Sequence, residues 1–201
     1  MAPTFWDERF AEDEFVYGTE PNVFLVEQAF RLKPGASILV PGDGEGRNGV
    51  WLASQGMDVF SVDGSAVGLA KARGLAAARG LAIRTEVADL CAWTWPSGGF
   101  DAIVSLFLHL APPDRARLHG KMIAALRPGG VVILEAFRPE QLAFSSGGPK
   151  DLSLLYRTEQ LADDFQDADI LLLEETLVDL DEGKLHKGPG ATVRLVARRK
   201  S

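Results

Sequence analysis

The chain has 201 residues, with 21 lysine and arginine residues against 28 aspartate and glutamate residues, and a formal net charge of −7. A hydrophobic content of 46% and a charged content of 24% exclude a disordered or fibrous protein. The acidic balance argues against nucleic acid as a partner. A chain of this length favours a single domain, residues 1–201, with a core that needs no disulfide.

We expect no targeting segment and no membrane span. Residues 1–15 are rich in acidic side chains, which is the wrong sign for a signal or transit peptide. No apolar run approaches the roughly 20 residues that a bilayer requires. A single cysteine, Cys91, excludes an internal disulfide framework and fits a reducing compartment. The sequence therefore predicts a soluble, cytoplasmic protein.

The expected elements begin with an N-terminal helical cap, residues 1–34. Thr19-Glu20-Pro21 is typical of a helix start, and the apolar residues that follow predict a helix that ends at Pro34-Gly35. A central region then alternates short apolar runs with helix formers. The expected strands are residues 38–40, 59–62, 83–87, 102–106 and 131–134, and the expected helices are residues 47–55 and 65–79 and a helix from Pro112 to Leu126. Arg127-Pro128-Gly129-Gly130 should end the last helix. This alternation implies right-handed βαβ units and a parallel sheet.

The C-terminal third lacks that alternation. Residues 138–149 are rich in glycine and serine, and residues 138–157 are expected to form a substrate lid loop. Residues 170–180 and 191–197 flank a polar turn at residues 181–190. This pattern predicts an antiparallel hairpin, because no room is left for a crossover helix.

The most informative segment is Gly42-Asp43-Gly44-Glu45-Gly46, between the first expected strand and a helix. Glycines let the chain turn sharply and let its backbone approach a ligand. In open parallel sheets, ligands bind at the carboxyl ends of the strands. The second expected strand ends in Asp63, about 20 residues further on, where a carboxylate can bind a ribose diol. We infer a nucleotide-like ligand; a tight turn without a ligand is the alternative.

The side chains of the turn distinguish between two nucleotide ligands. A dinucleotide fingerprint needs a small third residue, but Arg47 stands in that place. Asp43 and Glu45 would also repel a pyrophosphate, at a cost of the order of kcal/mol. A nucleoside that carries a sulfonium has the opposite preference. The sequence therefore favours S-adenosylmethionine over a nicotinamide dinucleotide.

The ordered motifs resemble class I S-adenosylmethionine-dependent methyltransferases. They are Gly42 to Gly46, Val62-Asp63-Gly64-Ser65, Ala88-Asp89-Leu90, Phe100 to Ser105 and Leu126 to Gly130. Trp6-Asp7-Glu8-Arg9-Phe10, Tyr17 to Asn22 and Gly44 to Asn48 are similar to the tellurite-resistance, TehB-like branch. The resemblance implies an α/β fold: a Rossmann-like, doubly wound, mostly parallel seven-stranded sheet with an antiparallel C-terminal hairpin. One departure is Val40, where many relatives carry an acidic residue. Either cofactor affinity is weakened by this change, or Asp43 or Glu45 substitutes for the missing acid.

The resemblance also implies roles for particular residues. The turn, with Gly42, Asp43 and Gly44, would line the methionine part of the cofactor. Asp63 would hold the ribose hydroxyls, and Gly64 or Ser65 would lie under the adenine. The remaining expected cofactor contacts are Asp89 and Leu90 at the adenine edge, Leu106 at the methionine moiety, and Tyr17 and Gly18 as a cover. For Asp63 and Asp89, a helix cap or a turn is the alternative role.

Methyl transfer from a sulfonium needs alignment and exclusion of water, and it needs a base only if the acceptor must lose a proton. His109, just beyond the fourth expected strand, could be the catalytic residue that orients or deprotonates an acceptor, and a structural role is equally open. The spacing of the histidines and Cys91 matches no metal site. The acceptor is expected to be a small molecule, such as a chalcogen oxyanion or a thiol. A nicotinamide-dependent oxidoreductase and a non-catalytic cofactor-binding module are the alternative functions.

Overall fold

The computed structural model describes residues 3–201, with side chains from residue 5 onward. The strands are β1 (Ser37–Pro41), β2 (Asp58–Asp63), β3 (Arg84–Val87), β4 (Phe100–Leu106), β5 (Leu126–Phe137), β6 (Asp169–Asp181) and β7 (Lys187–Arg198). The α-helices are α1 (Pro3–Arg9), α2 (Val23–Gln28), α3 (Arg47–Ser54), α4 (Ala66–Ala78), α5 (Pro112–Ala125) and α6 (Thr158–Asp164). Short 3-10 helices are η1 (Ala29–Arg31), η2 (Pro139–Ala143) and η3 (Leu152–Leu154).

The strands follow the order β3-β2-β1-β4-β5-β7-β6 in a seven-stranded sheet. Strands β1 and β2, β2 and β3, and β4 and β5 pair in parallel, whereas β7 is antiparallel to both β5 and β6. Parallel strands that alternate with helices and end in an antiparallel hairpin form the predicted Rossmann-like α/β architecture, which is thereby confirmed. Within residues 3–201, every helix is too short or too polar to cross a membrane.

The chain packs into two compact units. The first contains residues up to Thr94 together with Glu182–Leu185, and the second contains Trp95–Asp181 and His186–Ser201. Compactness is not the same as independent folding, so the single domain inferred from chain length stays a prediction.

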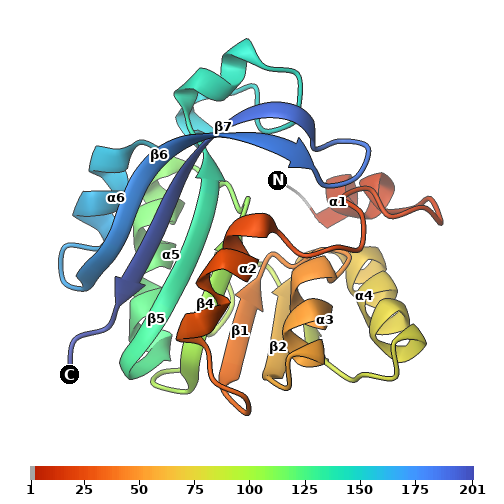
Figure 1. The fold of residues 1–201 in the computed structure, drawn as a ribbon, viewed down its shortest axis with the longest axis horizontal. Coiled ribbons are helices and arrows are strands. Elements are labelled where there is room, and N and C mark those ends of the chain that lie inside the picture. The colour runs from red at the N-terminus through yellow and green to blue at the C-terminus, as the bar shows by residue number, and fades with distance from the viewer. Residues whose placement is uncertain (1–2) are drawn as a thin grey trace. The chain divides into compact units, whose positions relative to one another are not determined.

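In the first unit, helices α3 and α4 pack on the parallel strands β2 and β3, and α1 packs on α4. Figure 1 shows α3 in front of β2 in this unit. The apolar runs of β1 and β2 supply fully buried side chains, among them Ile38, Leu39 and Val62. Ser65 caps α4, because its side chain accepts a hydrogen bond from the Gly68 amide. Local sequence therefore sets both where β2 ends and where α4 begins.

The expected N-terminal cap is helical only in part. Its first two residues lie outside the described range, and α1 and α2 are short helices separated by an irregular segment. Helix α2 begins at Val23, after Thr19-Glu20-Pro21, because the Asn22 side chain caps it by accepting from the Leu25 amide. It continues only as η1, which ends at Arg31 before Pro34.

In the second unit, α5 packs on β5, and α6 packs on both β6 and α5. A buried polar group joins the two helices: Arg115 Nε and His119 Nδ1 each lie 2.7 Å from Asp164 Oδ2. Helix α6 lies beside β6 in Figure 1. The sequence did not predict α6, since its seven residues, Thr158–Asp164, give too short a periodic pattern.

Other expectations for this unit need correction. The polar turn expected at residues 181–190 is shorter, because β6 continues to Asp181 and β7 starts at Lys187. Helix α5 ends at Ala125, and Leu126 to Gly130 already belong to β5. Residues 138–157 contain η2 and η3 rather than a loop alone; that they form a substrate lid stays a prediction.

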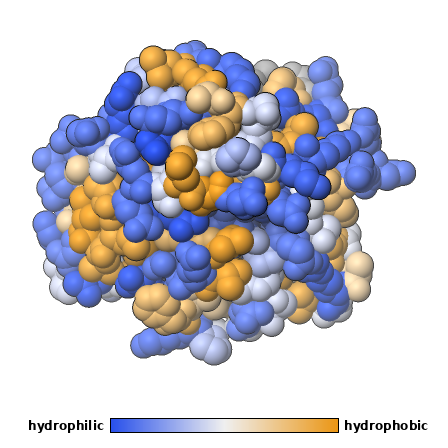
Figure 2. All heavy atoms as spheres, turned by 45° about the horizontal axis from the view of Figure 1, so that its top comes forward, coloured by the Kyte–Doolittle hydropathy of each residue, from blue (hydrophilic) through white to orange (hydrophobic). Residues whose placement is uncertain are grey.

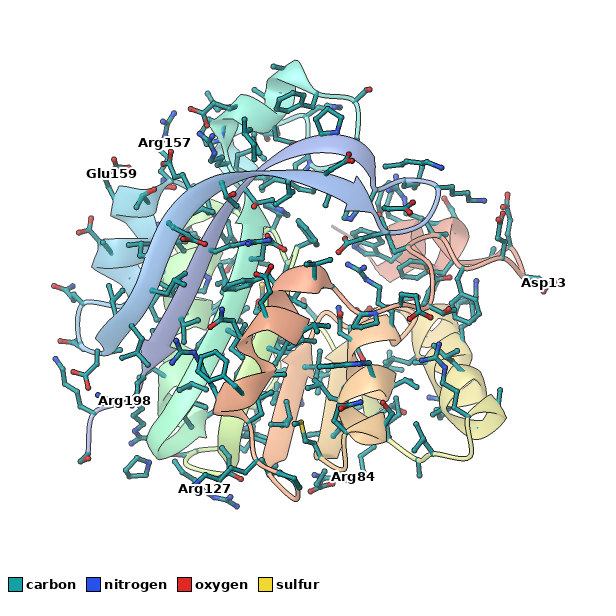
Figure 3. All side chains as sticks on the ribbon, in the orientation of Figure 1. Asp13, Arg84, Arg127, Arg157, Glu159 and Arg198 are labelled. Atoms are coloured by element: carbon teal, nitrogen blue, oxygen red, sulfur yellow. The ribbon has the colours of Figure 1, made fainter. Side chains whose placement is uncertain are left out.

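Polar side chains cover much of the surface that Figure 2 shows, with hydrophobic residues in separate patches between them. Exposed ion pairs include Arg84–Asp58 at 3.0 Å and Arg127–Asp101 at 2.7 Å, and both arginines point outward in Figure 3. Exposed pairs of this kind contribute about 0–1 kcal/mol each, so they do not determine the fold.

Candidate functional site

The glycine turn between β1 and α3 has a backbone that only glycine adopts readily. Gly42, Gly44 and Gly46 have φ angles of 71°, 55° and 87°. A Cβ on Gly46 would lie 2.4 Å from the Cβ of Ala72 in α4, so the turn also packs closely on that helix. The Gly42 amide bonds to the Val62 carbonyl at 2.8 Å and joins the turn to the end of β2. All three glycines thus serve the turn conformation, and Gly46 also allows close packing on α4.

Asp63 lies directly beside this turn. Its Oδ2 accepts a hydrogen bond from the Gly44 amide at 2.9 Å, and its Oδ1 accepts one from the Ser65 amide at 2.7 Å. The pKa of this carboxyl is raised by burial, and the hydrogen bonds from the Ser65 and Gly44 amides offset that effect only in part. Each carboxylate oxygen can accept a second hydrogen bond. The side chain is therefore held in one orientation and keeps acceptor capacity for a pair of hydroxyl groups.

Two more expected residues continue the same edge. Gly64 has open space around its Cα, because an added Cβ would meet only the Ala88 carbonyl oxygen, at 3.9 Å. Ser65 also donates its hydroxyl hydrogen to Asp7 Oδ1 at 2.6 Å, which links α1 to the first turn of α4. The structure thus brings Asp63, Gly64 and Ser65 together with the glycine turn.

Asp89 and Leu90 follow β3. Asp89 Oδ1 accepts a hydrogen bond from the Cys91 amide at 2.9 Å, and the Asp89 carbonyl accepts from Trp93 at 2.7 Å. This geometry is that of a turn residue, which was the alternative role for Asp89. Leu90 is buried beside it, with 7% of its surface exposed.

Tyr17 reaches the turn through Glu45, a residue that the sequence did not place among the cofactor contacts. Glu45 Oε2 accepts hydrogen bonds from the Val16 amide at 2.8 Å and the Tyr17 amide at 3.4 Å. Arg9 donates to the Tyr17 hydroxyl at 3.2 Å. The irregular segment after α1 is therefore bonded to a side chain of the glycine turn.

Asp43 has a structural geometry, although it was expected among the cofactor contacts. Ser61 donates its hydroxyl hydrogen to Asp43 Oδ2 at 2.6 Å, and the Gly49 amide donates to Oδ1 at 3.2 Å. Burial raises the pKa of Asp43 to about 6. Val40, in the place where relatives carry an acid, is itself buried. Asp43 thus supplies a buried carboxylate beneath the turn.

These contacts correct the charge argument made from the sequence. Asp43 bonds to β2 and α3, and Glu45 forms an ion pair of 2.6 Å with Lys71. Neither carboxylate is a free negative charge on the surface of the turn. A preference for a sulfonium over a pyrophosphate therefore does not follow from these two charges.

The other expected residues, Leu106 and His109, belong to the second unit. Leu106 ends β4 and is 8% exposed. His109 Nδ1 lies 2.8 Å from the Leu154 carbonyl oxygen, and Nε2 accepts from the Phe137 amide at 3.3 Å. These partners assign the proton to Nδ1. Desolvation lowers the pKa of His109 to about 4. Both ring nitrogens are thus engaged by the backbone, which favours the structural role over that of a base.

Phe107, which follows Leu106, has a backbone conformation that the sequence did not predict. Its φ of 54° makes it the only non-glycine residue with positive φ among those described. The centroid of its ring lies 4.6 Å from the ring centroid of Phe137 and 4.8 Å from that of His186. No local pattern signals such a conformation, because it depends on packing between distant segments. Among the side chains of residues 5–201, no three His, Cys, Asp or Glu residues are grouped so that they could hold a metal ion.

Comparison with known proteins adds independent information. Residues 38–130, which contain the glycine turn, Asp63, Asp89 and Leu106, match a family model described as a methyltransferase domain. A protein-L-isoaspartate O-methyltransferase of Methylorubrum populi is 32% identical over 143 residues, which cover 67% of each chain.

Two further relatives are matched over less of their length. A glycine/sarcosine N-methyltransferase of Halorhodospira halochloris is 37% identical over 138 residues, 65% of this chain and 49% of that protein. A thiopurine S-methyltransferase of Pseudomonas entomophila is 36% identical over 66 residues, 31% of each chain. The matched part thus spans about half of the length of the glycine/sarcosine N-methyltransferase and about a third of the length of the thiopurine S-methyltransferase.

The solved structure of TehB from Haemophilus influenzae has a similar fold. The TM-score is 0.73 with 20% sequence identity, over 98% of this chain and 67% of that one. At this identity the similarity concerns the fold alone.

Proposed function

Because this chain belongs to the methyltransferase-domain family with the class I, Rossmann-like fold, we propose that it transfers a methyl group from S-adenosylmethionine to a small-molecule acceptor. The observation that carries the proposal is the Asp63 carboxylate, held by the Gly44 and Ser65 amides beside the glycine turn. A carboxylate at the end of the second strand, next to such a turn, suits the hydroxyl pair of a ribose.

The residues present fit this cofactor. Asp63 keeps acceptor capacity for the ribose hydroxyls, and the open space at Gly64 leaves room for a flat ring. Arg47, at the start of α3, is 6% exposed, and its Nη1 has no hydrogen-bond partner among the described residues. A carboxylate at the methionine end would satisfy this buried donor. We assign Gly42 and Gly44 to the methionine part.

Further contacts are assigned on the same basis. Leu90 is buried at the end of β3, where it would meet the adenine ring, and Tyr17-Gly18 would cover the cofactor. Leu106, at the end of β4, would face the methionine moiety. We also assign Asp89 to the adenine edge, although its Oδ1 already accepts a hydrogen bond from the Cys91 amide within a turn.

The cofactor supplies a methyl group already activated by a positively charged sulfur. The protein's own residues then have to orient the acceptor and exclude water. His109 is not suited to take a proton, because its Nε2 already accepts from the Phe137 amide and its pKa is lowered to about 4. We therefore propose an acceptor that attacks without help from a base, such as a thiolate or a chalcogen oxyanion. The thiopurine S-methyltransferase relative supports a sulfur acceptor, whereas the other relatives are named for nitrogen and oxygen acceptors.

Calorimetric titration with S-adenosylmethionine tests the proposal, with NADH as the competing ligand. We expect wild-type protein to bind S-adenosylmethionine and Asp63→Ala to bind it at least tenfold more weakly, since charge-assisted hydrogen bonds contribute about 1.5–3 kcal/mol each. Asp58→Ala is the matched control, because Asp58 begins the same strand and its side chain forms an exposed ion pair with Arg84. Binding of NADH alone would overturn the proposal.

The acceptor is tested by mass spectrometry of reactions with thiols, selenite, tellurite, small amines and phenols. Methylation of thiols or chalcogen oxyanions is the expected result. Methylation of amines or phenols alone would refute the acceptor class but keep the methyl transfer. Binding without any methylated product would favour a non-catalytic module. The single cysteine leads us to propose that the protein works in a reducing cytoplasm.

A further inference from the structure

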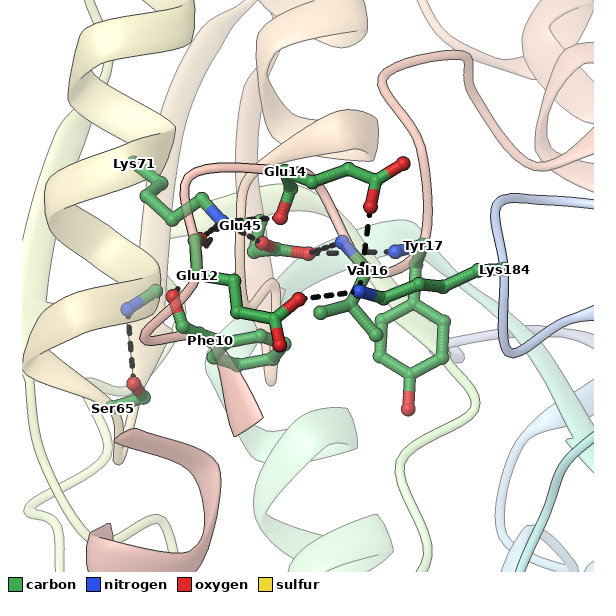
Figure 4. A network of polar contacts seen from close by, with 10 residues as sticks. Phe10, Glu12, Glu14, Val16, Tyr17, Glu45, Ser65, Lys71 and Lys184 are labelled. Atoms are coloured by element: carbon green, nitrogen blue, oxygen red, sulfur yellow. Dashed lines mark hydrogen bonds and ion pairs between the residues drawn. The ribbon is translucent and has the colours of Figure 1, made fainter. Parts of the chain in front are cut away.

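Lys71 of α4 is the centre of a group of polar contacts at the glycine turn, in which Glu45 is buried and Lys71 is partly buried. Its Nζ lies 2.6 Å from Glu45 Oε1 and donates to the carbonyl oxygens of Glu12 at 2.7 Å and Glu14 at 2.8 Å. Figure 4 shows Lys71 reaching from its helix toward Glu45 and the segment that carries Glu12 and Glu14. The same Nζ also lies 3.5 Å from the Phe10 carbonyl oxygen, so the three ammonium hydrogens are shared among four oxygen acceptors. The side chain is only 15% exposed.

Glu45 completes the connection from the other side. One of its oxygens faces Lys71, while the other accepts from the Val16 and Tyr17 amides. The side chain is 3% exposed. A buried charge is retained in a folded protein only where it is paired and hydrogen-bonded, and loss of one partner is expensive. Lys71 and Glu45 together therefore fix the backbone between Glu12 and Tyr17.

The position of Glu45 in the chain gives this contact its significance. Glu45 is the residue after Gly44, and the Gly44 amide orients Asp63. The anchor of the N-terminal segment is thus part of the turn that is proposed to hold the cofactor. If displacement of the segment weakens cofactor binding at the turn, then occupation of the turn must stabilise the segment to the same extent, because coupling between two sites is reciprocal.

Packing at the turn agrees with this connection. A Cβ on Gly44 would lie 3.2 Å from Cζ of Phe10, and a Cβ on Gly68 would lie 2.9 Å from Cδ2 of the same ring. Phe10, at the start of the segment, therefore rests on the turn and on α4. The segment from Phe10 to Tyr17 touches the turn at both of its ends.

We propose that Lys71 and Glu45 are positioning residues for methyl transfer: they hold residues 10–17 against the glycine turn, so that closure of this segment and binding of the cofactor support each other. The inference rests on the proposed function, since it takes the turn as the cofactor site. Lys71 touches no reacting atom and acts through Glu45 and the backbone of the segment.

Cofactor binding to two variants tests the inference. Lys71→Met removes the ammonium and keeps the aliphatic stem, and Glu45→Gln keeps the amides' acceptor while it removes the charge. We expect each variant to raise the Kd for S-adenosylmethionine at least tenfold, with KM for the cofactor increased more than kcat is decreased. Lys71→Arg, which keeps charge and donors, should recover most of the affinity.

The matched control is Lys184→Met. Lys184 approaches the same two residues, with its Nζ 2.6 Å from Glu12 Oε2 and 3.4 Å from Glu14 Oε2, but this side chain is 41% exposed. An exposed pair contributes little, so cofactor affinity should stay within twofold of wild type.

A second measurement separates positioning from simple loss of structure. Limited proteolysis should cut residues 10–17 slowly in wild type when S-adenosylmethionine is present, and the cofactor should no longer protect them in Lys71→Met or Glu45→Gln. Circular dichroism establishes that each variant is folded; if Lys71→Met unfolds, Glu45→Gln decides. Folded variants with wild-type affinity and protection would overturn the inference and leave the proposed function intact. Failure of wild type itself to bind the cofactor would overturn the proposed function.

Discussion

The Gly44 amide donates its hydrogen to Oδ2 of Asp63 over 2.9 Å, while the Ser65 amide donates to Oδ1. A residue of the glycine turn and a residue two positions after Asp63 thus each donate to one oxygen of the same carboxylate. Both partners are donors, so the site demands a side chain with two acceptor oxygens.

This demand predicts that Asp63→Asn is destabilising even though the two side chains have nearly the same shape. The Asn amide group presents a donor to one of the two backbone amides, and a buried donor without a partner costs about 1–3 kcal/mol. Urea unfolding should show a loss of that size, and Asp58→Asn, at the exposed start of β2, should change stability by less than about 0.5 kcal/mol. Equal stability of Asp63→Asn and wild type would contradict the geometry.

The raised pKa of Asp43 predicts that the free energy of unfolding decreases as pH rises. Its pKa is raised from 3.8 to about 6 because burial disfavours the charged form. The folded state therefore prefers the protonated acid, so this contribution is complete below pH 3.8 and is lost as pH rises through 6. The difference corresponds to about 3 kcal/mol.

Asp43→Asn should remove this loss, because its amide can donate to Ser61 while its oxygen still accepts from Gly49. At pH 8 the variant should be more stable than wild type by up to about 3 kcal/mol, and at pH 4 the two should converge. Urea midpoints between pH 4 and 8 measure both differences. A constant difference across that range would show that Asp43 does not titrate there.

His109 has the opposite effect on stability. Burial lowers its pKa from 6.5 to about 4, so the folded state prefers the neutral ring. Its contribution is present above pH 6.5 and is lost as pH falls from 6.5 toward 4, with a size of about 3 kcal/mol. NMR should show an imidazole that stays neutral at pH 5.5. An imidazole that titrates near 6.5 would refute the assignment of both ring nitrogens.

His109→Asn separates the structural from the catalytic role. The Asn amide can still donate to the Leu154 carbonyl, so the variant should fold with a stability loss of about 1–3 kcal/mol. If His109 is structural, kcat should stay within about tenfold of wild type at a temperature at which both are folded. A loss of a hundredfold or more, typical of a missing general base, would restore the catalytic role.

Gly46 and Gly56 form a matched pair for the packing of the turn. Their φ angles are 87° and 82°, so alanine at either position incurs a similar backbone cost of about 1–2 kcal/mol. A Cβ on Gly46 would lie 2.4 Å from the Cβ of Ala72, whereas nothing lies within 4 Å of one on Gly56. Gly46→Ala should therefore cost about 1–3 kcal/mol more than Gly56→Ala in chemical unfolding. Equal losses would mean that α4 moves away without cost.

The glycine turn and Asp63 were predictable because their signals are local. Glycines that follow an apolar run, and a carboxylate at the end of the next strand, both lie within about 20 residues. The partners of Asp43 and Glu45 were not predictable in this way. Ser61 and Lys71 come from other elements, and nothing in a single sequence says which of several nearby cations or hydroxyls a carboxylate meets. The charge argument failed for that reason.

The hairpin shows a similar limit. Its two strands were expected from their apolar residues, but β6 continues to Asp181 and β7 begins at Lys187, in a stretch whose polar composition predicts a turn. Cross-strand pairing outweighs local preference there. Helix α6 was missed because seven residues give little periodicity, and it gains its place from the contacts of Asp164 with Arg115 and His119.

The buried side chain of Arg47 has a consequence for folding during synthesis, because its ion-pair partner is far along the chain. Its Nη2 lies 2.8 Å from Oε2 of Glu182, 135 positions later in the chain, and Glu182 Oε1 accepts from the Asn22 side chain at 3.0 Å. A ribosome that has released only the first ninety or so residues has therefore produced every strand of the first unit but not the counter-charge for its buried arginine. The first unit can be completed only when the tip of the hairpin is synthesised, so a nascent chain that stops before Glu182 should remain a substrate for chaperones and proteases.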